Sequence, residues 1–333
     1  MTDPHSLYTP EQAEADAKFH PVAESALESG SEPPPTQAEV ATQHEKPRSL
    51  TSDALRDLRR NPIFIVSGIV IIILLVMAVA PGLFTNTDPR ACDLNQSRQP
   101  PGGGALFGYD IQGCDVYART IYGAQASIVV GFVTTVFVVI LGVLTGMFAG
   151  FYGGVTDSIL SRIIDIFFGI PLLLGGILVL ASFPSGPGTP KWQTMGKVCV
   201  ALAILGWTAL ARIMRSTVIQ VKQADYVNAA RALGGDARRL LRLHVLPNAV
   251  APVIVYATIV LGIFISAEAT LSYLGIGLQP PVISWGVAIN DAAGLVRQSP
   301  HMLLFPAAFL SITVLAFIMM GDAVRDAFDP RLR

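Results

Sequence analysis

Residues 225–247, DYVNAARALGGDARRLLRLHVLP, form a short polar and basic stretch between two long apolar runs. Asp225 is a residue type that favours the N-cap of a helix, and Gly234 can adopt the left-handed conformation that ends one. The stretch therefore predicts a first helix of about two turns. We expect Asp236 to cap a second helix, rich in leucine and arginine, which Pro247 ends.

The first predicted helix has one face made of small and apolar residues. Tyr226, Ala229, Ala230 and Leu233 follow the spacing i, i+3, i+4, i+7, which places them on one side of a helix. Isolated helices shorter than roughly 12–15 residues are marginal in water, so this helix needs a surface to pack on. The pattern fits equally a segment that docks into a groove of another protein and an amphipathic loop that packs on the chain's own helices.

The rest of the chain is strongly apolar, since 52% of its 333 residues are hydrophobic and only 14% are charged. We therefore expect an all-α, polytopic membrane protein with six transmembrane helices. A run of about 20 apolar residues is long enough to cross the hydrocarbon core of a bilayer. The predicted spans are Ile63–Phe84, Ser127–Phe151, Ile159–Phe183, Val198–Arg215, Ala249–Tyr273 and Met302–Met320.

Lysine and arginine are concentrated at one set of span ends, and this set includes residues 225–247. Because cytoplasmic flanks of membrane proteins carry the excess of these residues, we expect both termini and this loop to be cytoplasmic. The predicted divisions are a disordered acidic tail at 1–50, an interfacial amphipathic helix at 51–62, a transmembrane domain at 63–323 with an outer loop at 85–117, and a C-terminal tail at 324–333.

The outer loop contains two of the three cysteines, Cys92 and Cys114. If the loop faces outward, its compartment permits disulfides, and we favour a bond between the two over two separate free thiols. The cysteines show no CxxC spacing, so the sequence predicts no zinc or redox site and no metal ligands.

Two sets of charged residues lie within the predicted spans. Glu268 lies near the outer end of the fifth span, although a charge at mid-membrane costs about 2.5–3.5 kcal/mol. We favour a structural hydrogen bond to a neighbouring helix end; the alternative is a pathway or gate residue that meets a cationic group of a substrate. Arg162 and Asp165, one turn apart, are predicted to pair with each other or to reach the interface.

The chain lacks the signatures of an ATPase or a hydrolase. No GxxxxGK[ST], HExxH or GxSxG pattern occurs in it. We therefore expect a protein that is not an enzyme by itself. If ATP drives transport, a separate polypeptide hydrolyses it.

Several ordered blocks resemble one family of transport proteins. The run YVNAARALGG followed by HVLPN, within residues 226–248, resembles the "EAA" loop of permease subunits of ATP-binding-cassette (ABC) importers. Further blocks resemble the C-type permease of the dipeptide, oligopeptide and nickel importers, and the resemblance spans residues 52–333. These blocks are Leu106–Gly131, Ala149–Pro171, Glu268–Gly286 and Gly321–Arg333. The usual glutamate of the EAA motif is Asn228 here, so the carboxylate of the family motif is absent at this position.

The resemblance implies that the loop forms a coupling helix that sits in a cleft of an ATPase subunit. The implied coupling residues are Asp225, Tyr226, Asn228, Ala229, Ala230, Leu233 and Gly234. The implied partners are a homologous second permease, two ABC ATPases (separate or fused) and an extracytoplasmic substrate-binding protein, in a bacterial cell membrane and without nucleic acid. ATP and Mg²⁺ would bind to the ATPases, and this chain would bind no cofactor.

The resemblance implies di- or oligopeptides as substrates, while nickel, glutathione and haem importers share the same architecture. A different class is a secondary carrier driven by an ion gradient, which would predict intramembrane charge relays and inverted repeats. Glu268 alone gives little support for an intramembrane charge relay, and the sequence shows no inverted repeat. A membrane scaffold without transport is a third alternative.

Overall fold

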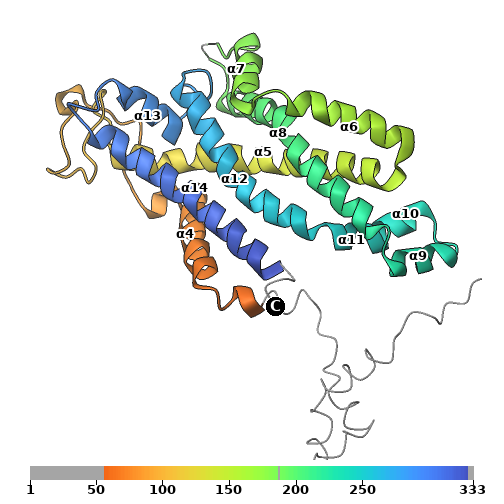
Figure 1. The fold of residues 1–333 in the computed structure, drawn as a ribbon. Helices are drawn as coiled ribbons and strands as arrows, with labels where there is room; N and C mark the ends of the chain where they lie inside the picture. The colour runs from red at the N-terminus through yellow and green to blue at the C-terminus, as the bar shows by residue number, and fades with distance from the viewer. Residues whose placement is uncertain (1–55, 187, 329–333) are drawn as a thin grey trace, which may run out of the picture. The chain divides into compact units, whose positions relative to one another are not determined.

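The computed structural model describes residues 56–186 and 188–328, so the predicted tail at 1–50 and residues 51–55 of the predicted interfacial helix lie outside the described residues. Within the described ranges the fold is all-α, which confirms the predicted class (Figure 1). Five of the described helices are long and apolar enough to cross a membrane. They are α4 (Pro62–Val79), α5 (Val116–Tyr152), α8 (Lys191–Val221), α12 (Ala251–Tyr273) and α14 (His301–Phe328).

The predicted third span is broken into two helices. α6 (Gly154–Phe168) and α7 (Leu172–Ser182) meet at an angle of 83° and together could form a sixth crossing. The predicted span Ile159–Phe183 is therefore not one continuous helix. Pro171 explains the break, because proline lacks a backbone N–H and disfavours helical geometry at the preceding Ile170.

Several helix ends differ from the prediction because of local capping residues. α4 ends at Val79 rather than Phe84, since Pro81 begins a separate 3₁₀ turn, η2 (Pro81–Leu83). α5 begins at Val116 rather than Ser127, because the carboxylate of Asp115 accepts hydrogen bonds from the first-turn N–H groups, at 2.7 Å for Tyr117. α14 continues to Phe328, into the predicted C-terminal tail.

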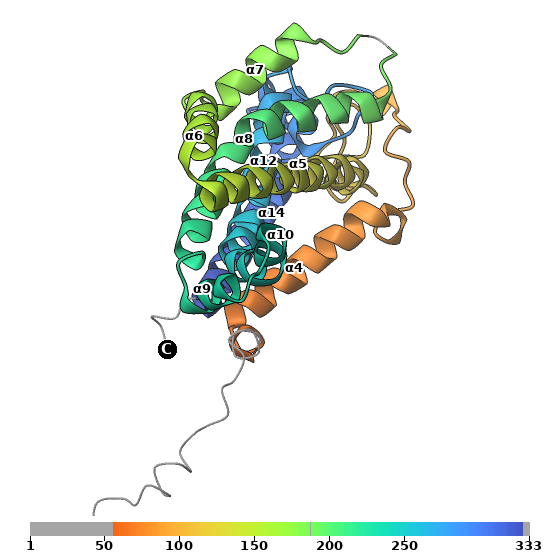
Figure 2. The same ribbon diagram turned by 90° about the vertical axis from the view of Figure 1, so that its right-hand side faces the viewer.

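The centre of the bundle is the packing of α5 along α8 (Figure 2). Gly142, Gly146 and Gly150 lie one turn apart on the face of α5 that meets α8. A Cβ atom on Gly146 would lie 2.8 Å from Met214 Cβ, and one on Gly150 would lie 2.8 Å from the carbonyl oxygen of Arg215. The absence of a side chain at these positions therefore allows the two backbones to approach closely. α12 packs on α14, α5 and α8, and α4 packs on α14 and α5.

The helices define two ends of the bundle (Figure 1). One end carries the short helices α9 (Asp225–Ala232), α10 (Ala237–Leu240) and α11 (Leu246–Ala249), together with the π-helical turn η4 (Leu241–Val245). We call it the α9 end. The opposite end carries loop 85–115, α7 and α13 (Trp285–Ala293).

The sequence did not predict α13. Ser284 caps the helix by accepting the N–H of Val287 at 3.2 Å. Trp285 is fully buried, and its indole N–H donates to the carbonyl oxygen of Thr120 at 2.9 Å. The tryptophan therefore fixes α13 to the start of α5.

Candidate functional site

The first candidate site is α9. Its N-cap is Ala224, and Asp225 is the first residue inside the helix, so the prediction that Asp225 caps it is wrong. Carboxylates are still favourable in a first turn, because the free N–H groups give that end partial positive charge. Asp236 does occupy the N-cap position of α10, but its side chain accepts no capping hydrogen bond.

α9 ends in the left-handed glycine that the sequence predicts. Gly234 has φ +84°, outside the range that side-chain-bearing residues usually adopt. Its N–H donates to the carbonyl of Arg231, and the N–H of Gly235 donates to the carbonyl of Ala230, both at 3.0 Å. These two hydrogen bonds form a Schellman motif, which fixes the direction of the chain after α9.

The predicted face of α9 is turned outward. Tyr226, Ala229 and Leu233 are exposed, and the Leu233 side chain is 89% exposed. Ala230 is half-buried against the core. Val227, on the opposite side of the helix, is fully buried and attaches α9 to the bundle. The structure thus leaves the apolar positions Tyr226 and Leu233 without cover within the described chain.

The segment after α9 is helical from Ala237 to Ala249 through a π-helical turn. Pro247 does not end this helix as predicted, because the π turn just before it accommodates a residue without an N–H. The arginines of this segment, Arg238, Arg239 and Arg242, are exposed. Asn228 donates its side-chain N–H to the carbonyl of Gln223 at 3.1 Å, which ties α9 to the end of α8.

Two ion pairs join α8, the helix that leads into α9, to α6. Arg215 binds the carboxylate of Asp157 through two nitrogen atoms, and Arg212 binds Asp165 at 2.7 Å while lying over the ring of Phe168. Asp165 therefore pairs with Arg212, so of the two predicted alternatives the pairing of Arg162 with Asp165 is wrong. Sequence reasoning missed these pairs, because 47 and 58 residues separate their partners.

At the opposite end, residues 85–115 form an ordered loop. Cys92 and Cys114 are joined by a disulfide. The carboxylate of Asp110 accepts the N–H of Cys114 at 2.9 Å and forms an ion pair with Arg119 at the start of α5. Phe107 stacks on Phe305 of α14, with ring centroids 3.8 Å apart. The loop is therefore held to both α5 and α14.

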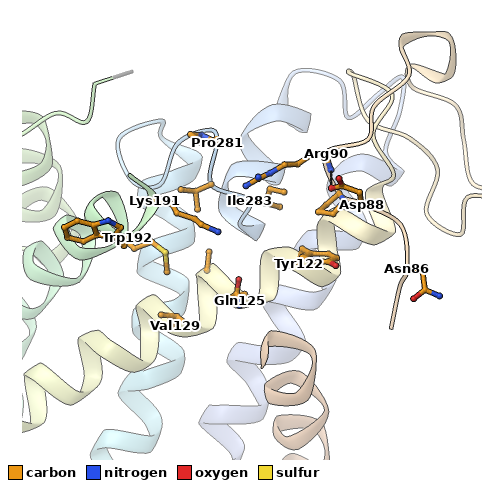
Figure 3. Close-up of a pocket in the computed structure, with 14 residues that line it drawn as sticks. Asn86, Asp88, Arg90, Tyr122, Gln125, Val129, Lys191, Trp192, Pro281 and Ile283 are labelled. Atoms are coloured by element: carbon orange, nitrogen blue, oxygen red, sulfur yellow. Dashed lines mark hydrogen bonds between the residues drawn. The ribbon is translucent and has the colours of Figure 1, made fainter. Parts of the chain in front are cut away.

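A cavity of about 660 Å³ opens beside this loop (Figure 3). Four segments line it: residues 86–90, the start of α5, the start of α8 and residues 281–283 before α13. Its charged residues are Asp88, Arg90 and Lys191. Sequence reasoning missed this site, because its lining residues come from four segments that are far apart in the chain.

Glu268 is fully buried in α12 and lines none of the larger cavities. Its Oε1 atom accepts hydrogen bonds from Ser272 at 2.7 Å and from Ser284, the N-cap of α13, at 3.3 Å. Its Oε2 atom has no hydrogen-bond partner among the described residues. This arrangement agrees with the favoured interpretation, a structural hydrogen bond to a neighbouring helix end.

No group of three or more His, Cys, Asp or Glu side chains in the described ranges could hold a metal ion.

Comparison with protein-family models gives two matches. The model for the "Binding-protein-dependent transport system inner membrane component" matches residues 142–333, which is more than half of the chain. A second model, the "N-terminal TM domain of oligopeptide transport permease C", matches residues 49–101.

Curated relatives align over most of the chain. The oligopeptide transport permease OppC of Bacillus subtilis is 38% identical, covering 86% of this chain and 92% of its own length. The dipeptide permease DppC of the same organism is also 38% identical, covering 86% of this chain and 87% of its own length. The glutathione transport permease GsiD of Pectobacterium atrosepticum is 32% identical, covering 84% of this chain and 90% of its own length. Among solved structures, a chain of the MetNI methionine ABC transporter is 19% identical, with a TM-score of 0.49 over 63% of this chain and 96% of that chain.

Proposed function

This chain belongs to the family of binding-protein-dependent transport system inner membrane components, and we propose that it is the C-type permease subunit of an ATP-driven importer of di- and oligopeptides. Oligopeptide and dipeptide permeases among the relatives, at 38% identity over most of both chains, support the substrate class. The observation that carries the assignment is the exposed apolar face of α9 at Tyr226, Ala229 and Leu233.

α9 has the properties of a segment that inserts into a partner. Its outward face is apolar and small, Val227 anchors its other face, and the Schellman motif at Gly234 fixes its direction. Tyr226 on this face is exposed, and tyrosine is one of the residue types that contribute most to binding at protein interfaces. We propose that two ATPases, separate or fused, bind the permeases. One receives α9 of this chain, and the other receives the equivalent helix of a homologous second permease.

The ion pairs of α8 would transmit a movement of α9 to α6. When the ATPases close on ATP, α9 would move with them, and only residues 222–224 separate α9 from α8. Because Arg215 and Arg212 of α8 hold Asp157 and Asp165 of α6, α6 would move together with α8. Movement of these helices against α12 and α14 would change access between the two ends of the bundle. ATP and Mg²⁺ would bind to the ATPases and not to this chain.

The proposed orientation places the α9 end and both termini in the cytoplasm of a bacterial cell. The excess of Lys and Arg at that end supports it. The Cys92–Cys114 disulfide at the opposite end also supports it, since disulfides persist in oxidising compartments. An extracytoplasmic binding protein would then deliver the substrate to the end that carries loop 85–115.

A matched pair of leucine substitutions tests the assignment. Leu233→Asp places a charge on the outward face of α9, whereas Leu94→Asp makes the same change on a side chain of similar exposure, 76%, at the opposite end. We expect Leu233→Asp to reduce both copurification of the ATPases and ATP-driven peptide uptake by about tenfold or more, because hot-spot truncations cost upwards of 1.4–2 kcal/mol. Leu94→Asp should retain copurification.

Substrate and energy source are measured in the same vesicles. The glutathione permease among the relatives makes glutathione the second candidate, and the shared architecture adds nickel and haem. Uptake of labelled dipeptide, glutathione, nickel and haem would rank them. Uptake that an ionophore abolishes and that persists without ATP would refute the ATP-driven mechanism in favour of a secondary carrier. ATPase binding without uptake of any of these substrates would point to a scaffold.

A further inference from the structure

The cavity beside loop 85–115 has an unusual distribution of charge. Arg90 from the loop and Lys191 from the start of α8 direct their charged groups into it from two sides (Figure 3). Neither side chain forms an ion pair or a side-chain hydrogen bond in the part of the chain that the structure describes. Both cations are therefore available to a ligand.

The third charged residue of the cavity is partly engaged. An oxygen of the Asp88 carboxylate accepts the backbone N–H of Arg90 at 2.9 Å, which fixes the turn that carries Arg90. The formal charge of the three lining side chains is +1, because two cations face one carboxylate. Such a set favours a ligand group with a single negative charge, and a carboxylate can accept hydrogen bonds from both arginine and lysine.

A second hollow of about 480 Å³ adjoins the first and shares Trp192 with it. Its wall is largely apolar and includes Val179, Phe183 and Val200. Trp192 is 73% exposed, whereas Trp207 and Trp285 are buried. Its ring therefore offers a free apolar surface next to the two cations. A ligand that fills both hollows would carry an anionic group beside an apolar side chain.

The remaining wall of the cavity is held rigidly. Residues 281–283 line it, and the next residue, Ser284, donates to the buried Glu268 while capping α13. On the other side, Gln125 of α5 donates to the carbonyl of Ala78 at 3.3 Å. These contacts preorganise the cavity, which lowers the ordering cost of binding.

We propose that this cavity binds the C-terminal residue of a peptide, with its carboxylate between Arg90 and Lys191 and its apolar side chain against Trp192. The inference rests on the proposed function and deepens it, because it assigns this chain a substrate-selecting site distinct from the binding protein. A nickel ion would be repelled by the two cations, because it is itself positively charged. The phosphate of a membrane lipid shares the anionic chemistry, and the test separates the two.

The test uses the full complex in nanodiscs, without binding protein, and a tripeptide Ala-Ala-Leu labelled at its N-terminus. Equilibrium binding of the free acid is compared with binding of the C-terminal amide, in wild type and in R90Q/K191Q. We expect wild type to prefer the acid by about tenfold, since hydrogen bonds to charged groups contribute roughly 1.5–3 kcal/mol. The double variant should lose this preference and bind the amide as wild type does.

Controls separate the inference from folding, from lipid binding and from the proposed function. Arg297→Gln removes an exposed cation at the same end that does not line the cavity, and it should behave as wild type. Equal binding of acid and amide by wild type, or a preference retained in R90Q/K191Q, would overturn the inference. Loss of peptide binding when anionic phosphatidylglycerol replaces zwitterionic phosphatidylcholine would assign the cavity to an anionic lipid headgroup and overturn it too. Uptake is measured separately: peptide import by a wild-type complex without acid preference would leave the proposed function standing.

Discussion

Arg215 donates two hydrogen bonds to the carboxylate of Asp157, of 2.5 Å and 2.7 Å, and so joins the end of α8 to the start of α6. Bidentate pairing of this kind fixes the relative orientation of two helices as well as their distance. The second pair, Arg212 with Asp165, lies one turn away on α8 and about two turns away on α6, and it is more exposed. The two pairs therefore contribute unequally to the connection.

Asp157→Asn should weaken this connection without changing its shape. We expect a loss of about 1 kcal/mol in the free energy of unfolding, because the pair is partly exposed and solvent screening reduces the energy of its charged hydrogen bonds. Peptide uptake should fall several-fold while the ATPases still bind. Thermal unfolding of the purified chain and vesicle uptake measure the two effects.

Asp165→Asn is the matched control for this prediction, since its pair is the more exposed one. It should change both quantities less than Asp157→Asn does. Equal effects of the two substitutions would show that the contribution of Asp157 does not depend on its bidentate geometry.

Gly234 should tolerate asparagine but not valine. Its φ of +84° costs a residue with a side chain about 1–2 kcal/mol, more for a β-branched one, whereas asparagine visits this region readily. A Cβ atom at this position meets no other atom, so any effect arises from the backbone. We expect Gly234→Val to uncouple ATP hydrolysis from peptide uptake and Gly234→Asn to retain uptake.

Gly294→Val is the control for Gly234, because Gly294 also has free space around it but a negative φ of −73°. It should leave uptake near the wild-type rate. Unchanged ATP-driven uptake in Gly234→Val would refute the role of the left-handed turn in coupling.

Glu268 should act as a structural acceptor. Glu268→Ala leaves the hydroxyl groups of Ser272 and Ser284 without this acceptor and creates a cavity, so we expect a loss of about 1–3 kcal/mol or more on unfolding. Glu268→Gln keeps an acceptor oxygen and should retain most of the stability and uptake. If Glu268→Gln unfolds as wild type does yet no longer imports peptide, the carboxylate has a direct part in transport.

The disulfide of loop 85–115 should stabilise the end that carries the cavity. Loss of a cross-link spanning 22 residues costs about 3 kcal/mol in the chain-entropy model, so we expect Cys92→Ser/Cys114→Ser to unfold at a lower temperature. Peptide mapping without reductant should recover the two cysteines as one linked fragment. Alkylation of either cysteine in the native, unreduced protein would contradict the bond. Cys199, which is buried, should react only after unfolding.

The sequence by itself determined the features that depend on neighbouring residues. The length of the apolar runs predicted the fold class. The i, i+3, i+4, i+7 pattern predicted one face of α9, which the structure leaves exposed at Tyr226, Ala229 and Leu233. The pair of glycines gave the end of α9, because left-handed geometry is a local property of glycine. The substrate class remains a proposal that relatives support.

Only the tertiary structure decided which distant residues meet. Proline at 171 was visible in the sequence, but the 83° bend depends on how α6 and α7 pack on α8. Asp165 pairs with Arg212 and not with the neighbouring Arg162, because the packing of α6 on α8 places Arg212 beside Asp165. The cavity likewise takes its cations from residues 90 and 191, and no local pattern relates side chains so far apart in the chain.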